Sequence, residues 1–284
     1  MDPLIQGLVM GIVQGLTEFL PISSSGHLII VPFLLGWTDS SGTPLPGTDP
    51  FITSLAFSVM LHIGTLIALL VFFRADWFRL VPAGLAAIRD RSFGGDKDRR
   101  LAWLLVTATI PGAIAGFLLN DIIEERFRDV GLVALTLVIG AVILWLADRW
   151  GSRNKGVDDV TFPQAAGFGA AQAIALVPGI SRSGISISAA RLAGLDREAA
   201  ARFSFLMATP ITAGAAIFEI RKLATGEAGV TVSLGPLVVG LIAALVSGML
   251  AIGLMLRYLR TRSLTIFVVY RIVLAVVVVI AWLR

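Results

Sequence analysis

The sequence lacks cysteine entirely, and it is poor in charged residues. Without cysteine the protein can form no disulfide, use no thiolate as a nucleophile and bind no metal through sulfur. Only 15% of its 284 residues are charged, whereas a soluble domain has about a quarter. Apolar residues make up 56% of the chain. That surplus cannot be hidden in a soluble core of this size, so the sequence predicts an integral membrane protein surrounded by membrane lipid.

The charge pattern also argues against a nucleic-acid partner. The net charge is only +4, and a nucleic-acid-binding protein would show a basic stripe on a folded surface. Lys and Arg instead gather in short stretches between apolar runs, which normally stay on the cytoplasmic side. These stretches are 74–100, 148–163, 191–198 and 257–263. Placing them inside puts both chain termini outside, unless residues 4–20 cross the membrane fully and move the N-terminus inside.

Six segments approach the length of about 20 apolar residues that a membrane-spanning helix needs. They are residues 51–73, 101–119, 131–147, 199–219, 236–256 and 264–283. Two further regions, 4–36 and 164–195, each hold an apolar run, a break rich in Pro, Gly and Ser, and a short apolar run. Arms this short are typical of re-entrant hairpins, whose irregular backbone must be surrounded by protein or by a wet cavity.

The two interrupted regions match each other without a gap when Gln14 is set on Gln172. Ser23 then falls on Ser181, Ser25 on Ser183, and Gly26 on Gly184. We therefore interpret the chain as one all-α membrane domain, 1–284, made of two repeats, 1–150 and 151–284. Each repeat holds one re-entrant hairpin and three transmembrane helices. Because three is an odd number, the second repeat is inverted, and the breaks are expected to meet near the membrane midplane.

The first hairpin concentrates polar residues suited to acid–base chemistry. Gln14 and Glu18 are four residues apart and so share a helix face, and Pro21 ends or kinks that helix. Three hydroxyls, a glycine and an imidazole follow, at Ser23, Ser24, Ser25, Gly26 and His27. If the helix resumes there, Ser24 and His27 share a face because they are three residues apart.

The second hairpin contains features that suit an anion. The turn at Pro178 and Gly179 opens onto a predicted helix, whose first N–H groups and positive dipole end favour phosphate. Arg182 adds a planar, charged fork that fits phosphate oxygens, and Ser181 and Ser183 add hydroxyl donors. Hydrolysis of a phosphate ester or anhydride needs such charge neutralisation, together with a nucleophile or base. A metal ion bound by Glu18, with Gln14 as a neutral oxygen ligand, would share the neutralising task.

These motifs resemble the two signature motifs of the undecaprenyl-diphosphate phosphatase family of the bacitracin-resistance type. The motifs are Gln14-x-x-x-Glu18 with the following Pro-Ile-Ser-Ser-Ser-Gly-His, and Pro178-Gly-x-Ser-Arg-Ser. The resemblance covers essentially the whole chain. It implies hydrolysis of undecaprenyl diphosphate to undecaprenyl phosphate and inorganic phosphate, which recycles the lipid carrier for cell-wall synthesis and gives bacitracin resistance. It also implies a divalent cation, magnesium or calcium, and a site facing the outer side of the bacterial cytoplasmic membrane.

The resemblance assigns four residues to catalysis, namely Glu18, Ser24, His27 and Arg182. We expect the phosphate groups to be bound by Ser23, Ser25, Gly26, Ser181, Ser183 and Gly184. Gln14 stands where the family has Glu or Gln, and the Gln form leaves only one carboxylate for a metal. The nucleophile is Ser24 or His27, unless water attacks directly. The sequence leaves this choice open, as it does the oligomeric state, a homodimer included.

A transporter or lipid flippase is the main alternative, because inverted repeats with facing hairpins are transporter architecture. Binding alone needs no nucleophile, so the hydroxyl-rich run beside Glu18 favours an enzyme, and both activities can coexist. A purely structural subunit conflicts with the density of ionisable groups in both hairpins. We expect the remaining polar residues in or near the spans to be structural: His62, Arg202, Glu219 and Arg271.

Overall fold

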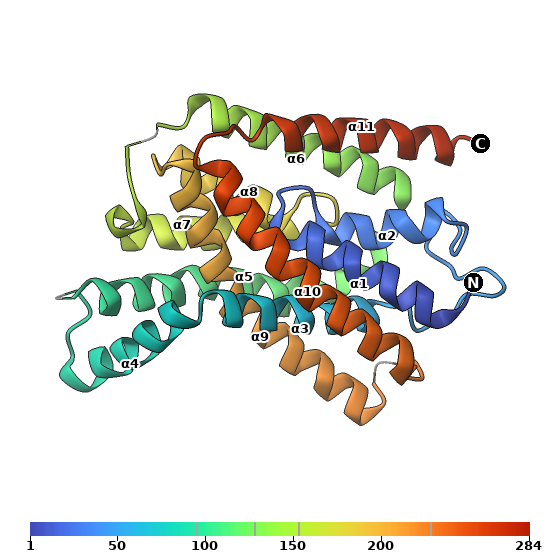
Figure 1. Cartoon of the computed structure of the whole chain (residues 1–284), viewed down its shortest axis with the longest axis horizontal. Helices are drawn as coiled ribbons and strands as arrows, with labels where there is room; N and C mark the ends of the chain where they lie inside the picture. Colours follow the sequence, from blue (N-terminus) through green and yellow to red (C-terminus); the bar gives the residue numbers. More distant parts are fainter. Residues whose placement is uncertain (95, 128, 153, 228) are drawn as a thin grey trace.

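A computed structural model describes residues 1–94, 96–127, 129–152, 154–227 and 229–284, and its regular elements there are helices (Figure 1). Within these ranges, six helices are long and apolar enough to cross a membrane. They are α3 (Leu55–Phe72), α5 (Lys97–Arg126), α6 (Val130–Trp150), α9 (Arg197–Thr225), α10 (Leu234–Leu259) and α11 (Thr265–Trp282). The prediction of an all-α protein with six candidate membrane-spanning helices is confirmed.

The two interrupted regions form two pairs of short helices. These are α1 (Pro3–Phe19) with α2 (Ser24–Leu34), and α7 (Phe162–Ala173) with α8 (Arg182–Leu192). Ser23 and Ser181 are the N-cap residues of α2 and α8, and both have positive φ angles, 75° and 77°. Each hydroxyl accepts a hydrogen bond from the N–H of the glycine three residues later, at 3.3 Å and 3.1 Å respectively. Such strained backbone is typical of functional sites.

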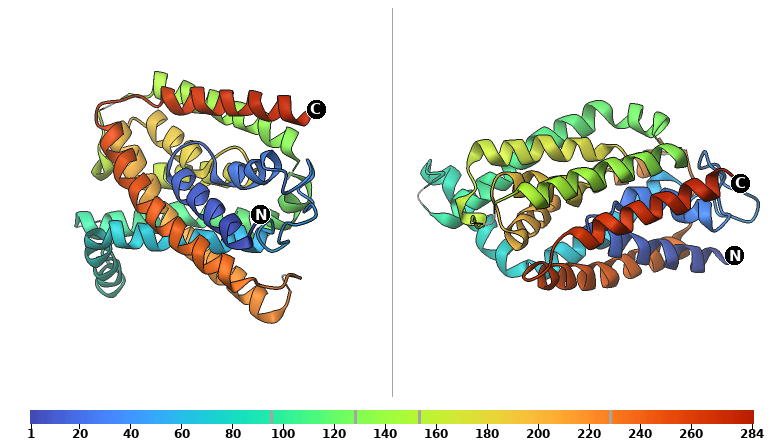
Figure 2. Two further views of the ribbon diagram at one scale, coloured as in Figure 1. Left: turned by 45° about the vertical axis from the view of Figure 1, so that its right-hand side comes forward. Right: turned by 90° about the horizontal axis from the view of Figure 1, so that it is seen from above.

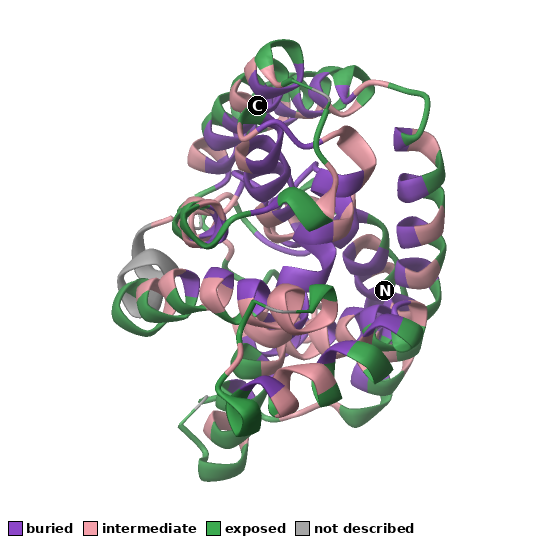
Figure 3. Cartoon of the chain, turned by 90° about the vertical axis from the view of Figure 1, so that its left-hand side faces the viewer, coloured by how far each residue is buried: buried purple, intermediate pink, exposed green. Residues whose placement is uncertain are grey.

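The long helices are arranged so that their apolar side chains face outward as well as inward. Figure 1 shows α6 and α11 side by side, and both chain termini at the same end of the molecule; the view from above in Figure 2 agrees. Figure 3 shows buried residues on the inner sides of the helices and exposed residues outside. Phe117, Ile217 and Leu254 are 83%, 70% and 65% exposed. Large apolar side chains this exposed are expected to contact membrane lipid.

Three glycines on α1 allow α10 to pack very closely against it. A Cβ on Gly11 would lie 2.2 Å from the carbonyl oxygen of Gly240, and one on Gly7 would lie 2.5 Å from that of Pro236. The third, Gly15, faces Ser247 in the same way. Small residues at this spacing let helix backbones approach each other in a membrane. The close contact fixes the helix that carries Gln14 and Glu18.

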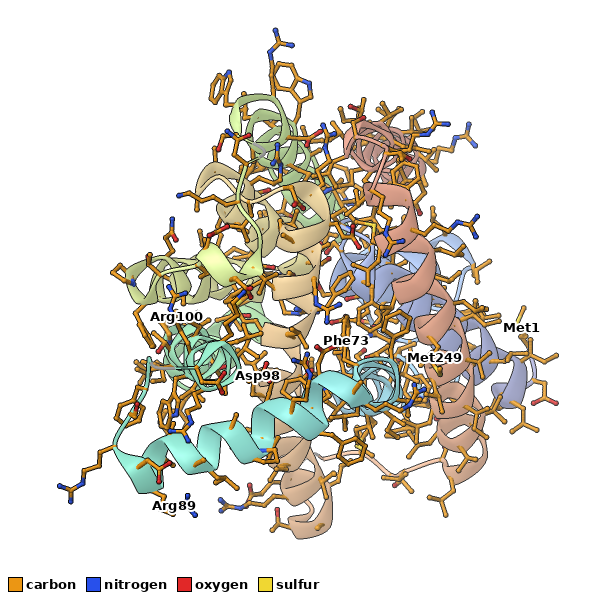
Figure 4. The ribbon with its side chains drawn as sticks, turned by 60° about the vertical axis from the view of Figure 1, so that its left-hand side comes forward. Met1, Phe73, Arg89, Asp98, Arg100 and Met249 are labelled. Carbon is orange, nitrogen blue, oxygen red and sulfur yellow. The ribbon has the colours of Figure 1, made fainter. Side chains whose placement is uncertain are left out.

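Residues 74–100, which sequence analysis treated as a loop, contain a further helix, α4 (Arg74–Asp90). It packs against α5 and runs away from the bundle between Phe73 and Arg89 (Figure 4). Its outer face carries four large exposed apolar residues at helical spacing. They are Phe78, Val81, Leu85 and Ile88. An apolar face among arginines is typical of a helix lying in the membrane interface, and those charges are why the segment resembled a loop.

Candidate active site

The breaks in the two hairpins are in direct contact. The Gly179 N–H donates to the Ser23 hydroxyl at 3.1 Å, and the Ser183 hydroxyl donates to the Leu20 carbonyl at 3.0 Å. From α6, the Thr136 hydroxyl donates to the Pro178 carbonyl at 2.6 Å. Gly179 has a φ of 95°, and a Cβ there would overlap the Thr136 hydroxyl. The close approach of the hairpins therefore requires glycine at this position.

Arg271 on α11 contacts the breaks of both hairpins through its side chain. Its side chain is completely buried, and its guanidinium donates only to backbone carbonyls among the contacts described. These belong to Leu137 (3.1 Å), Pro21 (3.3 Å), Gly179 (2.7 Å) and Ile180 (3.0 Å). A buried charge is tolerated when it is fully hydrogen-bonded. These contacts agree with the expectation that Arg271 is structural, which stays a prediction.

Glu18 lies at the centre of a polar cluster that both hairpins supply. Its Oε1 accepts from Arg182 Nη2 at 2.9 Å, so an ion pair joins α1 to α8. Its Oε2 accepts from the Ser24 hydroxyl at 2.6 Å and from Gln14 Nε2 at 3.0 Å. Glu18 and Gln14 are buried, whereas Ser24 and Arg182 are partly accessible. The cluster is therefore closed toward α1 and open toward Ser24 and Arg182.

The backbone and side chains of α9 hold Arg182 from its other side. The Arg182 Nη1 donates to the Ser204 carbonyl at 3.4 Å. The hydroxyls of Ser186 and Ser204 are 2.6 Å apart, and the Ser186 hydroxyl also lies 2.7 Å from the Arg182 carbonyl, to which it donates. Support of this kind keeps a charged side chain in one orientation. Arg182 is thus fixed with Nη2 directed at the Glu18 carboxylate and Nη1 at the Ser204 carbonyl.

The fourth residue predicted to be catalytic, His27, is hydrogen-bonded elsewhere. Its Nδ1 lies 2.7 Å from the Ser23 carbonyl, and its Nε2 lies 2.7 Å from the Tyr270 hydroxyl on α11. Among the predicted catalytic residues, the structure therefore brings Ser24 and Arg182 into contact with Glu18. His27 is carried by the same helix as Ser24 but has different partners.

The serines and glycines predicted to bind phosphate line the breaks and bond to one another. Ser23 and Ser25 hydroxyls are 3.3 Å apart, and those of Ser181 and Ser183 are 3.2 Å apart. The N–H groups of the following glycines, Gly26 and Gly184, are taken by the two N-cap serines. In this structure the serine hydroxyls and glycine N–H groups connect the two hairpins and cap the N-termini of α2 and α8. Their contact with phosphate stays a prediction.

Sequence analysis missed His62 and Tyr270. His62 of α3, which we expected to be structural, places Nε2 3.4 Å from Glu18 Oε2 and Nδ1 2.8 Å from the Ser58 carbonyl. It is one of only two histidines in the chain, and an imidazole inside an apolar span is a signal that could have found it. Tyr270 is one of two tyrosines, but nothing in the pattern connects it to a histidine 243 residues away.

A metal ion could be held here only with help from the substrate. In the described part of the chain, no group of three or more His, Asp or Glu side chains comes together. Glu18 is the single carboxylate of the cluster. The Oε1 of Gln14 is buried and has no hydrogen-bond partner among the described residues, so it fits the role of a neutral oxygen ligand. Magnesium and calcium accept such oxygens together with phosphate oxygens.

Comparison with known proteins agrees with this chemistry. A family model described as "Bacitracin resistance protein BacA" matches residues 7–277. A protein of Desulforudis audaxviator named undecaprenyl-diphosphatase is 45% identical over 285 residues, covering 100% of both chains. Proteins of the same name from Gemmatimonas aurantiaca and Moorella thermoacetica are 45% and 44% identical, covering 96% and 99% of this chain and 96% and 98% of their own.

Proposed function

Since the chain belongs to the BacA family of bacitracin resistance proteins, we infer that it is an undecaprenyl-diphosphatase. It hydrolyses undecaprenyl diphosphate to undecaprenyl phosphate and inorganic phosphate, and so returns the lipid carrier to cell-wall synthesis and confers bacitracin resistance. The observation that carries this function is the contact of Glu18 with both Ser24 and Arg182. It unites a base, a hydroxyl and a phosphate-binding fork inside an apolar protein.

In our proposed mechanism, the diphosphate draws the Arg182 fork away from Glu18. A guanidinium binds two phosphate oxygens in parallel, so it exchanges one anionic partner for another. Glu18 then takes the proton of the Ser24 hydroxyl, which is already 2.6 Å from its Oε2. The Ser24 oxygen bonds to the terminal phosphorus, and the bond from that phosphorus to the bridging oxygen breaks, which releases undecaprenyl phosphate. The departing phosphate oxygen takes the proton from Glu18. Water then hydrolyses the phosphoserine, which releases inorganic phosphate and restores the Ser24 hydroxyl.

Direct attack by water, with Glu18 as the base, gives the same products without a covalent intermediate. A rapid acid quench of the wild-type protein with labelled substrate distinguishes the two routes. Phosphate trapped on Ser24 supports the covalent route. Repeated failure to trap it, with a substrate made chiral at the terminal phosphorus showing net inversion, would establish attack by water.

A divalent cation is the proposed cofactor, held by Glu18, Gln14 and the diphosphate. When bound, magnesium or calcium would neutralise charge on the phosphate oxygens. We expect Gln14→Glu to lower the cation concentration for half-maximal activity by about tenfold, because affinity rises with the number of charged ligands. The measurement is phosphate release against cation concentration, beside cation binding to the protein alone by calorimetry. An unchanged requirement and unchanged binding would remove Gln14 from the cation site.

We further propose two inverted repeats, each a re-entrant hairpin plus three transmembrane helices, in the bacterial cytoplasmic membrane with the site facing outward. Support comes from the three candidate spans in each half and from the positive φ angles of Ser23 and Ser181, 75° and 77°. The stretches rich in Lys and Arg support the orientation.

The absence of cysteine makes this orientation simple to test. Single cysteines introduced as Glu227→Cys and Arg262→Cys lie in loops assigned to opposite sides. We expect a membrane-impermeant thiol reagent to label the first in intact cells and the second only after the membrane is opened. The reverse pattern would invert the orientation, and labelling of both in intact cells would rule out the assigned topology.

The activity itself is tested by phosphate release from undecaprenyl diphosphate. The protein is purified in detergent, supplied with lipid, and assayed with and without magnesium or calcium. Release by the wild-type protein supports the enzyme. No release from folded protein would overturn it and make transport of a lipid phosphate the better interpretation, since the helix arrangement also suits a transporter.

A further inference from the structure

The environment of His27 determines which of its nitrogens carries hydrogen. Nδ1 is 2.7 Å from the Ser23 carbonyl oxygen, and a carbonyl oxygen can only accept a hydrogen bond. Nδ1 must therefore carry the hydrogen. In the neutral ring, Nε2 is then a bare acceptor whose lone pair points away from Ser23.

The Tyr270 hydroxyl covers that lone pair. Its oxygen lies 2.7 Å from His27 Nε2, and the two rings are stacked with centroids 5.7 Å apart and an interplanar angle of 9°. Because Nε2 of the neutral ring is an acceptor, Tyr270 donates to it. A phenol hydroxyl can also turn and accept, so it can remain bonded to Nε2 when the imidazole gains a proton. His27 is only 4% exposed, which leaves little room for water to do the same.

We propose that Tyr270 is a positioning residue for His27, whose Nε2 takes the proton of the water that hydrolyses the phosphoserine and gives it to the departing Ser24 oxygen, and that His27 is not the nucleophile. The proposal rests on the phosphatase function inferred above. A nucleophilic imidazole would need a free lone pair at Nε2, and that lone pair is occupied. Ser24, three residues earlier on α2, has its hydroxyl directed at Glu18 instead. The helix α2 thus carries a nucleophile and a separately held proton carrier.

The first test is Tyr270→Phe, which retains the stacked ring and removes only the hydroxyl. We expect kcat to fall by about tenfold, the cost of one hydrogen bond to a reacting group, while KM stays close to wild type because Arg182 and Glu18 are untouched. The matched control is Tyr258→Phe at the only other tyrosine, whose ring packs edge-on against Phe267 at the start of α11 and has no contact with His27 among those described. It should leave kcat unchanged.

A double-mutant cycle with His27→Gln separates positioning from general structural support. If Tyr270 acts through His27, adding Tyr270→Phe to His27→Gln has no further effect on kcat. An equal loss in both backgrounds would overturn the proposal. The outcome is distinct from failure of the phosphatase function, which would show as absence of phosphate release by the wild-type protein itself.

A spectroscopic measurement tests the hydrogen bond between the Tyr270 hydroxyl and His27 Nε2 directly, even where a variant is too slow to assay. Nitrogen-15 spectra of ring-labelled histidine contain signals from only His27 and His62, and His27→Gln identifies which belong to His27. We expect Tyr270→Phe to shift the Nε2 resonance of His27 and leave that of Nδ1 nearly in place, since Ser23 still holds it. An unmoved Nε2 resonance in the folded variant would show that the hydroxyl does not bond to the ring.

Discussion

Phosphate release from undecaprenyl diphosphate is expected to fall by about 10³-fold when Glu18 is replaced by Gln, a typical loss for a positioned base. The amide has the same size but cannot take the proton of the Ser24 hydroxyl, which lies 2.6 Å from the carboxylate. The substitution also removes the negative charge that forms an ion pair with Arg182. The initial rate over a range of substrate concentrations gives kcat and KM separately, and the loss should lie mainly in kcat.

The control for this result is Glu227→Gln, which makes the same chemical change at an exposed residue. Its kcat should equal that of the wild type. Thermal unfolding in the same detergent shows whether Glu18→Gln is folded, because a partly buried arginine that loses its ion pair can destabilise the protein. A folded Glu18→Gln protein that releases phosphate at the wild-type rate would contradict the role of Glu18 as the base.

The second large effect is expected for Arg182→Ala, with a loss of about 10³-fold or more in kcat/KM. A guanidinium stabilises the charge on the transferred phosphoryl group, and at this position nothing else on α8 replaces it. Arg182→Lys keeps the charge but loses the planar fork, so its rate should lie between those of the wild type and the alanine variant. Phosphate release and competition by inorganic diphosphate give the rates and the binding separately.

The arginine comparison needs a variant that loses an equal charge far from the cluster. Arg262→Ala serves this purpose because the residue is exposed in the turn between α10 and α11. We expect it to have wild-type kinetics. If Arg182→Ala and Arg182→Lys were both as active as this control, the fork would not contact phosphate, and the ion pair with Glu18 would have only a structural role.

Much of the fold follows from local patterns in the sequence. The six spans are long apolar runs, and the breaks occur where a proline or a Pro-Gly pair cannot continue a helix. The contact between Gln14 and Glu18 follows from a spacing of four residues on one helix. The pairing of Glu18 with Arg182 was expected only in general terms, from two hairpins that meet, and the structure supplies the distance of 2.9 Å.

The remaining contacts depend on helices that are far apart in the sequence. His62 approaches Glu18 because α3 packs beside α1 and α10, and Tyr270 reaches His27 because α11 lies near α2. No spacing within a segment encodes either contact. The helix α4 was missed for a different reason. Its apolar residues recur at helical intervals, from Phe78 to Ile88, but arginines and aspartates near them suggested a polar loop.

The buried guanidinium of Arg271 has a consequence for how the protein is made. It donates to carbonyls of Pro21, Gly179 and Ile180, yet it sits on a helix that leaves the ribosome after every other part of the site. Until α11 inserts, those carbonyls have no donor in an apolar interior, where an unpaired backbone group costs several kcal/mol. The catalytic centre is therefore completed late in biogenesis, and chains that stop before α11 should be recognisable to membrane proteases as unfinished.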